Sequence, residues 1–251
     1  MGDERIKVPA LRARVMVATP CYTGYVAYEC AESMRQATVW CAQQGVVLDW
    51  QFVICCSVIQ HARNWLTAVF LENKEYSHLL WLDADEGFEP NAIMKLIDSG
   101  LDVIGGVYPQ KYDQPTQFIP MGPEVEGPIQ RMRLLQGGFL MLRRHVMEEL
   151  ASRSETFGMS VGGEWRLCPH VFDIVITVDP FNPKYPDGKV LAGEDYILSC
   201  KLVEAGYELY ARTDIQFVHV GRHRWSGSAA RRRRQEIPNP SLAQPLNDRV
   251  Q

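Results

Sequence analysis

Apolar residues recur along the first half of the chain with two alternating patterns. Continuous apolar runs of the strand type occupy four segments, at residues 12–19, 46–55, 78–83 and 102–108. Segments with helical spacing or composition separate them, at residues 26–44, 59–73 and 91–100. Pro90, directly before the last segment, is expected at the first helical position. This order is typical of an α/β fold in which helices cover both faces of a mostly parallel sheet.

The pattern changes after Tyr108. Prolines, glycines and short β-type runs up to residue 144 indicate a hairpin or a mixed region, and a helix is expected from Arg144. An irregular stretch at 154–189, a helix at 194–206 and a last strand at 214–220 complete the second half. We therefore predict one domain over residues 1–228, with a regular half at 14–108 and a mixed α+β half at 109–221. Residues 229–251 are predicted to form a basic, flexible tail.

Composition narrows the class of protein only slightly. The 251 residues are 46% hydrophobic and 22% charged with a net charge of -4, which is ordinary for a globular protein. No secretory signal or membrane-spanning run is visible, so a cytoplasmic location is expected. The seven cysteines have no CxxC spacing and fall mostly in apolar segments, which predicts buried thiols and no zinc site. Nothing in the sequence predicts an oligomeric state.

The segment "LLWLDADEGF" (79–88) concentrates the candidate chemistry. An apolar strand is expected to end at Asp83, at the sheet edge where parallel α/β proteins bind ligands. If the backbone stays extended, Asp83 and Asp85 face the same side. Two close carboxylates repel each other, and a hard divalent cation such as Mg²⁺ or Mn²⁺ removes that conflict. A solvated acidic loop with a helix cap is the alternative interpretation.

Five segments in order resemble the GT-A class of glycosyltransferases, in particular its family 2 branch and short viral or phage-type members. They are "VATPCYTGY", the strand ending in "DAD", "LLQGGFLMLRR", "GED" at the start of a helix, and the late "HVG". The resemblance spans residues Arg14 to Gly221. It implies a nucleotide-sugar half at 14–108, an acceptor half at 109–221, and a nucleotide-diphosphate sugar, such as a UDP-sugar, as donor.

The resemblance assigns the donor side of the site. Asp83, Ala84 and Asp85 correspond to the DxD motif that binds Mn²⁺ or Mg²⁺ and the donor diphosphate, and His219 corresponds to a third metal ligand. The remaining residues expected near the donor lie in four other segments. They are Thr19, Pro20 and Tyr22 near the nucleotide base, Arg63 and Asn64, Gly137 and Gly138, and Arg222 or Arg224 near the phosphates.

The resemblance also implies a general base in "AGED". In inverting members an acid at this point deprotonates the acceptor hydroxyl, which favours Asp195 over Glu194. Each could instead be a helix-start acid stabilised by the dipole. The acceptor is expected to be a saccharide or glycoconjugate, or a modified base in DNA.

Two other classes remain open from the sequence. In a haloacid-dehalogenase-like phosphatase Asp83 would be the nucleophile, but the motif falls late in the chain and no later lysine with a double acid follows. A non-catalytic nucleic-acid or carbohydrate binder is suggested by "GRHRWSGSAARRRR", whose arginines suit phosphates and whose Trp suits stacking. In the glycosyltransferase reading, the run Arg231–Arg234 would serve the acceptor side.

Overall fold

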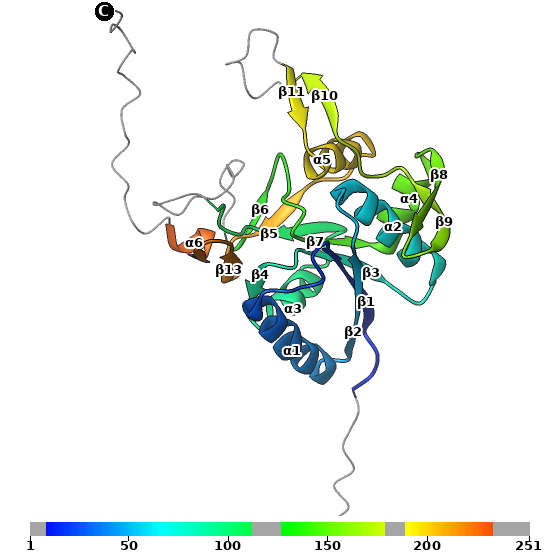
Figure 1. Ribbon diagram of the computed structural model, residues 1–251. Helices are drawn as coiled ribbons and strands as arrows, with labels where there is room; N and C mark the ends of the chain where they lie inside the picture. The colour runs from blue at the N-terminus through cyan, green and yellow to red at the C-terminus, as the bar shows by residue number, and fades with distance from the viewer. Residues whose placement is uncertain (1–8, 112–126, 179–188, 233–251) are drawn as a thin grey trace, which may run out of the picture.

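The computed structural model describes residues 9–111, 127–178 and 189–232. Its centre is a seven-stranded sheet with the spatial order β2-β1-β3-β7-β5-β12-β6 (Figure 1). The strands of this sheet are β1 (Ala13–Cys21), β2 (Val46–Ile54), β3 (His78–Leu82), β5 (Val103–Gly106), β6 (Ile129–Arg131), β7 (Phe139–Arg143) and β12 (Tyr210–Arg212).

The sheet is mostly parallel, as predicted. Strand β1 is parallel to both β2 and β3, and β12 is parallel to β5. Strand β7 lies between β3 and β5 and is antiparallel to both, and β6 is antiparallel to β12 at the edge. Thus β2, β1, β3, β5 and β12 run in one direction and only β7 and β6 oppose them. Within the described residues 127–144 the region is mixed rather than a hairpin, because β6 and β7 pair with other strands and not with each other.

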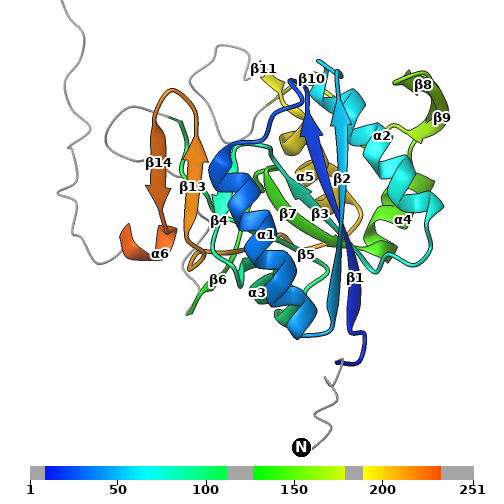
Figure 2. The ribbon, with the colours of Figure 1, turned by 60° about the horizontal axis from the view of Figure 1, so that its bottom comes forward.

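Helices cover both faces of this sheet, which confirms the predicted fold class (Figures 1 and 2). Helices α1 (Tyr28–Gln43) and α3 (Ala92–Asp98) pack on one face, and α2 (Ile59–Glu72), α4 (Arg144–Ser152) and α5 (Glu194–Glu204) pack on the other. Side chains alternate along β1, so Val15 and Val17 pack in the hydrophobic cluster under α1 and α3. Met16 and Ala18 pack in the cluster under α2, α4 and α5.

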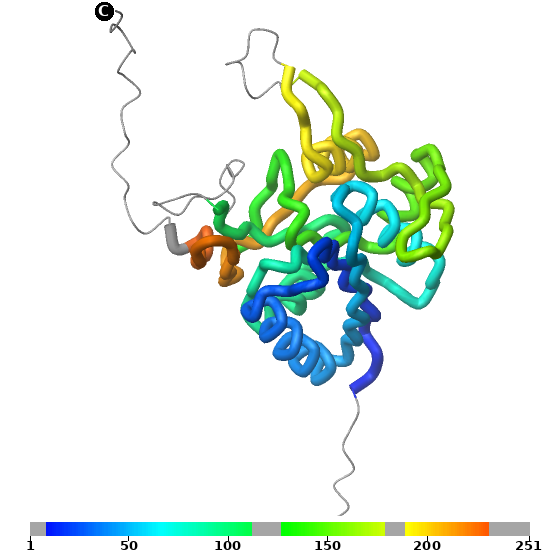
Figure 3. Tube along the Cα trace, viewed as in Figure 1, coloured from blue at the N-terminus to red at the C-terminus, as the bar shows by residue number. Residues whose placement is uncertain are grey.

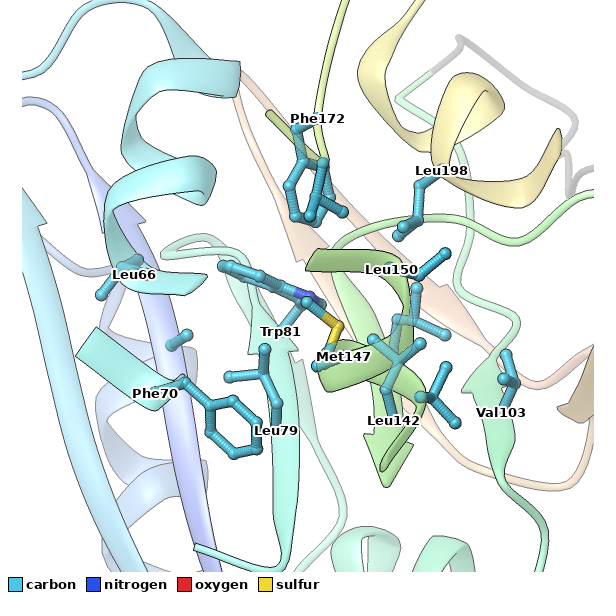
Figure 4. Packing of buried hydrophobic residues seen from close by; sticks show 14 of the residues in the cluster. Leu66, Phe70, Leu79, Trp81, Val103, Leu142, Met147, Leu150, Phe172 and Leu198 are labelled. Atoms are coloured by element: carbon cyan, nitrogen blue, oxygen red, sulfur yellow. The ribbon is translucent and has the colours of Figure 1, made fainter. Parts of the chain in front are cut away.

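Trp81 organises the core beneath α2. Its ring is fully buried and meets Phe172 edge-on, with the ring centroids 5.0 Å apart. Figure 4 shows Trp81 between Leu66 of α2, Phe172 and Met147 of α4. The apolar part of "LLWLD" is therefore scaffold, and it fixes the position of the acids that follow it.

A second, three-stranded sheet joins the acidic segment to the end of the described chain. Its order is β14-β13-β4, with β4 (Glu86–Phe88), β13 (Phe217–Val220) and β14 (Arg224–Gly227). The predicted last strand therefore exists, but it pairs with β4 outside the main sheet. The register of β13 against β4 places His219 opposite Glu86.

The stretch predicted to be irregular contains two antiparallel ribbons. Strands β8 (Thr156–Val161) and β9 (Glu164–Pro169) form a hairpin that turns at Gly162 and Gly163, both at positive φ. Strands β10 (Val175–Val178) and β11 (Lys189–Ala192) form the other, which projects from the body in Figure 3. The prediction at 154–189 was wrong for these segments, since the Gly-Gly dipeptide between strand-type residues is a hairpin signal.

Other boundaries differ from the predicted ones. Helix α3 begins at Ala92 after an Asn91 cap, so Pro90 precedes the helix. Helix α6 (Ala229–Arg232) follows β14 with Ala229 fully buried, so the folded part extends beyond residue 228; residues 233–251 lie outside the described part. All seven cysteines are free thiols, but Cys55 is exposed. No helix among the described residues is long and apolar enough to cross a membrane.

Candidate active site

The "DAD" segment is a turn rather than a continued strand. Strand β3 ends at Leu82, where its pairing with β7 stops, and the Asp83 N–H donates to the Gly138 carbonyl at 3.0 Å. The Glu86 N–H then donates back to the Asp83 carbonyl at 3.2 Å. The expectation that an extended backbone places the Asp83 and Asp85 side chains on the same side was therefore wrong. The turn directs the Asp83 carboxylate to Arg63 and the Asp85 carboxylate to His219.

Asp85, Glu86 and His219 form a cluster suited to a metal ion. Their candidate ligand atoms all lie within 4.8 Å of one another. His219 Nε2 is 3.2 Å from Glu86 Oε1 and 3.6 Å from Asp85 Oδ1. His219 Nδ1 is 2.8 Å from the Pro109 carbonyl, which can only accept, so Nδ1 carries the hydrogen. With Nδ1 held in this way, Nε2 faces the two acids, which is the arrangement found in many metal-binding histidines.

Glu86 is the unusual member of this cluster. Its side chain is 0% exposed, and neither carboxylate oxygen has a hydrogen-bond partner among the described residues. Burial, and then the charges of Asp83 and Asp85, raise the pKa of Glu86 to about 10. A buried carboxyl without a partner is costly unless a proton or a cation neutralises it.

The pKa of Asp85 is shifted in the opposite direction to that of Glu86. Burial alone would raise its pKa, but hydrogen bonds to His219 and Lys111 outweigh burial and lower it. Asp85 therefore stays ionised beside a neutral Glu86. The predicted metal set was Asp83, Asp85 and His219, whereas the structure brings Glu86 together with the last two. The sequence showed Glu86 as a third acid, but its role depends on the pairing of β4 with β13.

The buried Arg63 side chain connects Asp83 of the acidic turn with Glu194 of α5 (Glu194–Glu204). Its side chain is 2% exposed, with Nη2 3.1 Å from Asp83 Oδ1 and Nε 3.3 Å from Glu194 Oε1. Nη1 donates to the Gly137 carbonyl at 3.0 Å. The guanidinium also lies 5.2 Å from the Trp81 ring centroid and 5.7 Å from that of Phe172. Arg63 was expected to contact a donor phosphate, but the structure places it under the site, between two carboxylates.

Gly137 and Gly138 leave room for these contacts. A Cβ atom at Gly138 would lie 2.6 Å from Tyr108 Oη and 2.7 Å from Asp83 Oδ2, and one at Gly137 would lie 3.0 Å from Arg63 Nη2. The Gly138 N–H donates to the Tyr108 hydroxyl at 3.0 Å, and burial raises the pKa of that hydroxyl well above its usual value. Any side chain here would displace Asp83 or Arg63, so both glycines are required by close packing.

Glu194 and Asp195 open helix α5 after the Gly193 cap. Glu194 points to Arg63, whereas Asp195 lies beside Gly137, its Cβ 3.3 Å from where a Gly137 Cβ would stand. Asp195 Oδ1 accepts from the Tyr196 N–H at 2.8 Å, and no ion pair with another described residue engages it. The two acids are thus in different electrostatic settings, although they are adjacent in sequence.

A pocket opens beside the acidic turn at the carboxyl ends of β1 and β3. Its volume is about 320 Å³, and it is lined by Pro20, Thr23, Tyr25, Ala27, Ile59, Asp83, Ala84 and Asp85. Thr19 precedes the lining residue Pro20 in the chain and is fully buried. Its hydroxyl has no hydrogen-bond partner among the described residues. Tyr22 is 60% exposed at the end of β1, outside the lining.

Some predicted residues have other surroundings. The Asn64 amide accepts from the N–H groups of Val171 and Phe172 and donates to the Phe172 carbonyl, so it fixes that loop. Arg222 is exposed, and Arg224 pairs with Glu29 of α1. The backbone of Arg231 and Arg232 belongs to α6, whereas Arg233 and Arg234 lie outside the described residues.

The Arg63 network makes a stability prediction. Arg63→Met removes the cation but keeps an apolar stem against Trp81 and Phe172, leaving two acids without their partner. Unfolding in urea should show a loss of about 3 kcal/mol, the lower end for breaking a buried pair, because Asp83 and Glu194 retain solvent contact. Arg12→Met, in an ion pair about half exposed, should leave the midpoint nearly unchanged. Equal midpoints for both variants would contradict the role assigned to Arg63.

Comparisons with known proteins agree with the fold. No family model matches the sequence, and a search of curated proteins finds no match. Among solved structures, A197 from STIV is 16% identical, covering 87% of this chain and 91% of its own, with a TM-score of 0.54. This likeness shows that the two chains share a fold.

Two further solved structures are more distant. A glycosyltransferase involved in the glycosylation of the major capsid of PBCV-1 is 11% identical over 55% of this chain and 63% of its own, with a TM-score of 0.32. The inositol-1-phosphate CTP transferase from T. maritima is 8% identical over 85% of this chain and 90% of its own, with a TM-score of 0.40.

Proposed function

We propose that this chain is a metal-dependent glycosyltransferase of the GT-A class, which moves a sugar from a nucleotide-diphosphate donor to an acceptor hydroxyl. The observation that supports it best is the cluster of Asp85, Glu86 and His219, in which the fully buried Glu86 carboxyl group has no hydrogen-bond partner among the described residues. The cluster follows the carboxyl end of β3 beside a pocket, and Arg63 joins Asp83 of the same turn to Glu194 of α5. This arrangement supports the proposal, because the segments that the resemblance assigns to donor and acceptor are linked through one side chain.

The residues of the cluster fit Mn²⁺ or Mg²⁺. Two carboxylates and an imidazole whose other nitrogen is held by a backbone carbonyl are suitable ligands for Mn²⁺, and the oxygens suit Mg²⁺. Asp85, Glu86 and His219 would hold the ion. When bound, the ion would neutralise the donor diphosphate as the sugar–phosphate bond breaks. Asp83, held by Arg63, would face the nucleotide side of the same pocket.

Asp195 is the general base in this proposal. The acceptor oxygen attacks the anomeric carbon, the bond to the diphosphate breaks, and the acceptor proton passes to a carboxylate. Glu194 is paired with the buried guanidinium of Arg63, so its carboxylate is already engaged within the protein. Asp195 has no such partner among the described residues and packs beside Gly137. A base on the face opposite the leaving group corresponds to an inverting reaction.

The proposal is tested by metal and nucleotide binding as a function of pH. UDP, GDP, CDP and ADP should be titrated calorimetrically with and without Mn²⁺, and at least one should bind only with the metal. Mn²⁺ must displace the Glu86 proton, and that pKa is about 10. Metal affinity should therefore rise with pH from 6 to 8, by up to about tenfold per unit.

Glu86→Gln is the control for the pH dependence of metal binding. Glu86→Gln keeps the neutral shape but cannot lose a proton, so its weaker metal binding should vary much less with pH. Absence of Mn²⁺ binding by the unaltered protein at millimolar concentration would contradict the proposed metal site. Nucleotide binding of equal strength without metal would contradict the proposed donor mode.

A further inference from the structure

Lys111 reaches into the acidic cluster from outside the predicted motifs. Its Nζ contacts Asp85 Oδ2, while the other Asp85 oxygen faces His219. The Lys111 side chain is 35% exposed and that of Asp85 is 41% exposed. Lys111 is therefore the cation that balances Asp85 in the structure described here.

The path of the Lys111 side chain is built into the fold. A Cβ atom at Gly221 would lie 3.4 Å from Lys111 Cδ and 3.0 Å from the Trp225 ring. The aliphatic stem therefore runs past a glycine at the end of β13, where the neighbouring Val220 N–H donates to the Asp85 carbonyl at 2.9 Å. This arrangement guides the ammonium to one carboxylate rather than to bulk solvent.

Lys111 and a metal ion would compete for the Asp85 carboxylate. A divalent cation at Asp85, Glu86 and His219 would repel the ammonium and compete for the same carboxylate. A donor diphosphate brings negative charge to the same place, and an ammonium is a well-suited phosphate partner. The two events have opposite consequences for Lys111: metal alone displaces it, whereas the diphosphate attracts it.

We propose that Lys111 is an internal counter-cation that weakens binding of the metal alone and then binds the donor diphosphate. This inference rests on the proposed function, because it requires the metal and the diphosphate to share the acidic turn. It makes Lys111 a substrate-binding residue that favours the complete metal–donor pair over the free ion. Neither the DxD segment nor the other motifs of the sequence indicate this residue.

Two calorimetric titrations test the role of Lys111. In Lys111→Met the affinity for Mn²⁺ alone should rise about fivefold, the scale of losing a partly exposed ion pair. With Mn²⁺ saturating, the affinity for each nucleoside diphosphate that binds the unaltered protein should fall by about tenfold, the scale of one lost charge-assisted hydrogen bond. Lys111→Arg keeps the charge and should stay close to the unaltered protein in both titrations.

The controls separate this inference from the proposed function. Lys74→Met removes an exposed lysine that pairs with Glu148 on α4, so it should alter neither affinity. If the unaltered protein binds Mn²⁺ and Lys111→Met binds it equally well, the counter-cation role is wrong while the metal site stands. If Mn²⁺ binds more tightly but diphosphate affinity does not fall, the diphosphate contact is wrong. If the unaltered protein binds no Mn²⁺, both proposals fail.

Discussion

Replacing Asp195 with asparagine is expected to slow sugar transfer by about 10²–10⁴-fold, the usual contribution of a general base. The amide keeps the size of the side chain and can still accept the Tyr196 N–H, so the start of α5 should remain intact. Metal and nucleotide binding should be unchanged, because Asp195 is not one of the three residues of the proposed metal site. Single-turnover transfer with the donor and acceptor found by screening would measure the effect.

Glu194→Gln is the matched control for this prediction. Its amide keeps the size of the carboxylate beside the Arg63 guanidinium, and Arg63 retains its contacts with Asp83 and Gly137, so the network beneath the site is weakened rather than lost. Most of the transfer rate should remain. A large loss in Glu194→Gln together with normal turnover in Asp195→Asn would reverse the two assignments, and normal turnover in both would place the base elsewhere.

Asp85→Ala is expected to abolish transfer and Mn²⁺-dependent nucleotide binding. The substitution removes one of three ligands, and it also removes the charge that helps to keep the Glu86 pKa near 10. The fold should tolerate the change, because Asp85 is 41% exposed and a partly exposed ion pair such as the one with Lys111 contributes little to stability. Thermal unfolding without metal should therefore show a nearly unchanged Tm.

Asp98→Ala provides the comparison, since Asp98 is a similarly exposed acid that pairs with Arg12 away from the cluster. It should bind Mn²⁺ and nucleotide normally. Metal-dependent nucleotide binding that survives in Asp85→Ala with the affinity of the unaltered protein would remove Asp85 from the metal site.

The sequence predicted the regular part of the fold because local patterns determine it. The apolar runs of β1, β2, β3 and β5 and the periodicity of α2 are visible without knowledge of the tertiary structure. The position of β7 is not, because "FLMLR" has the same apolar character wherever it is inserted in the sheet. The β8–β9 hairpin is a different case, since its Gly162–Gly163 turn was readable and was overlooked.

The candidate site was predictable as a set of segments but not as a set of contacts. Asp85 and His219 were expected together, and the structure brings them together. Glu86 joins them only because β4 pairs with β13 in one register. Arg63 resembles an exposed helical arginine in sequence, and only the packing of Trp81 and Phe172 reveals it as buried. Contacts between distant segments decide these roles, and single-sequence patterns do not report them.

The antiparallel strand β7 has a consequence for how the chain reaches its native state. It separates β3 from β5, so these two strands share no hydrogen bonds and are bridged only by residues 139–143. On the ribosome, residues 13–106 can be synthesised completely while the inner edges of β3 and β5 still lack their partner. Strands β3 and β5 are joined only after β7 has emerged, and Gly138 can then reach Asp83. Strands β12 and β13 follow much later in the chain, so the sheet and the acidic cluster are both completed by contacts of high sequence separation, and the first half cannot be expected to acquire the site alone.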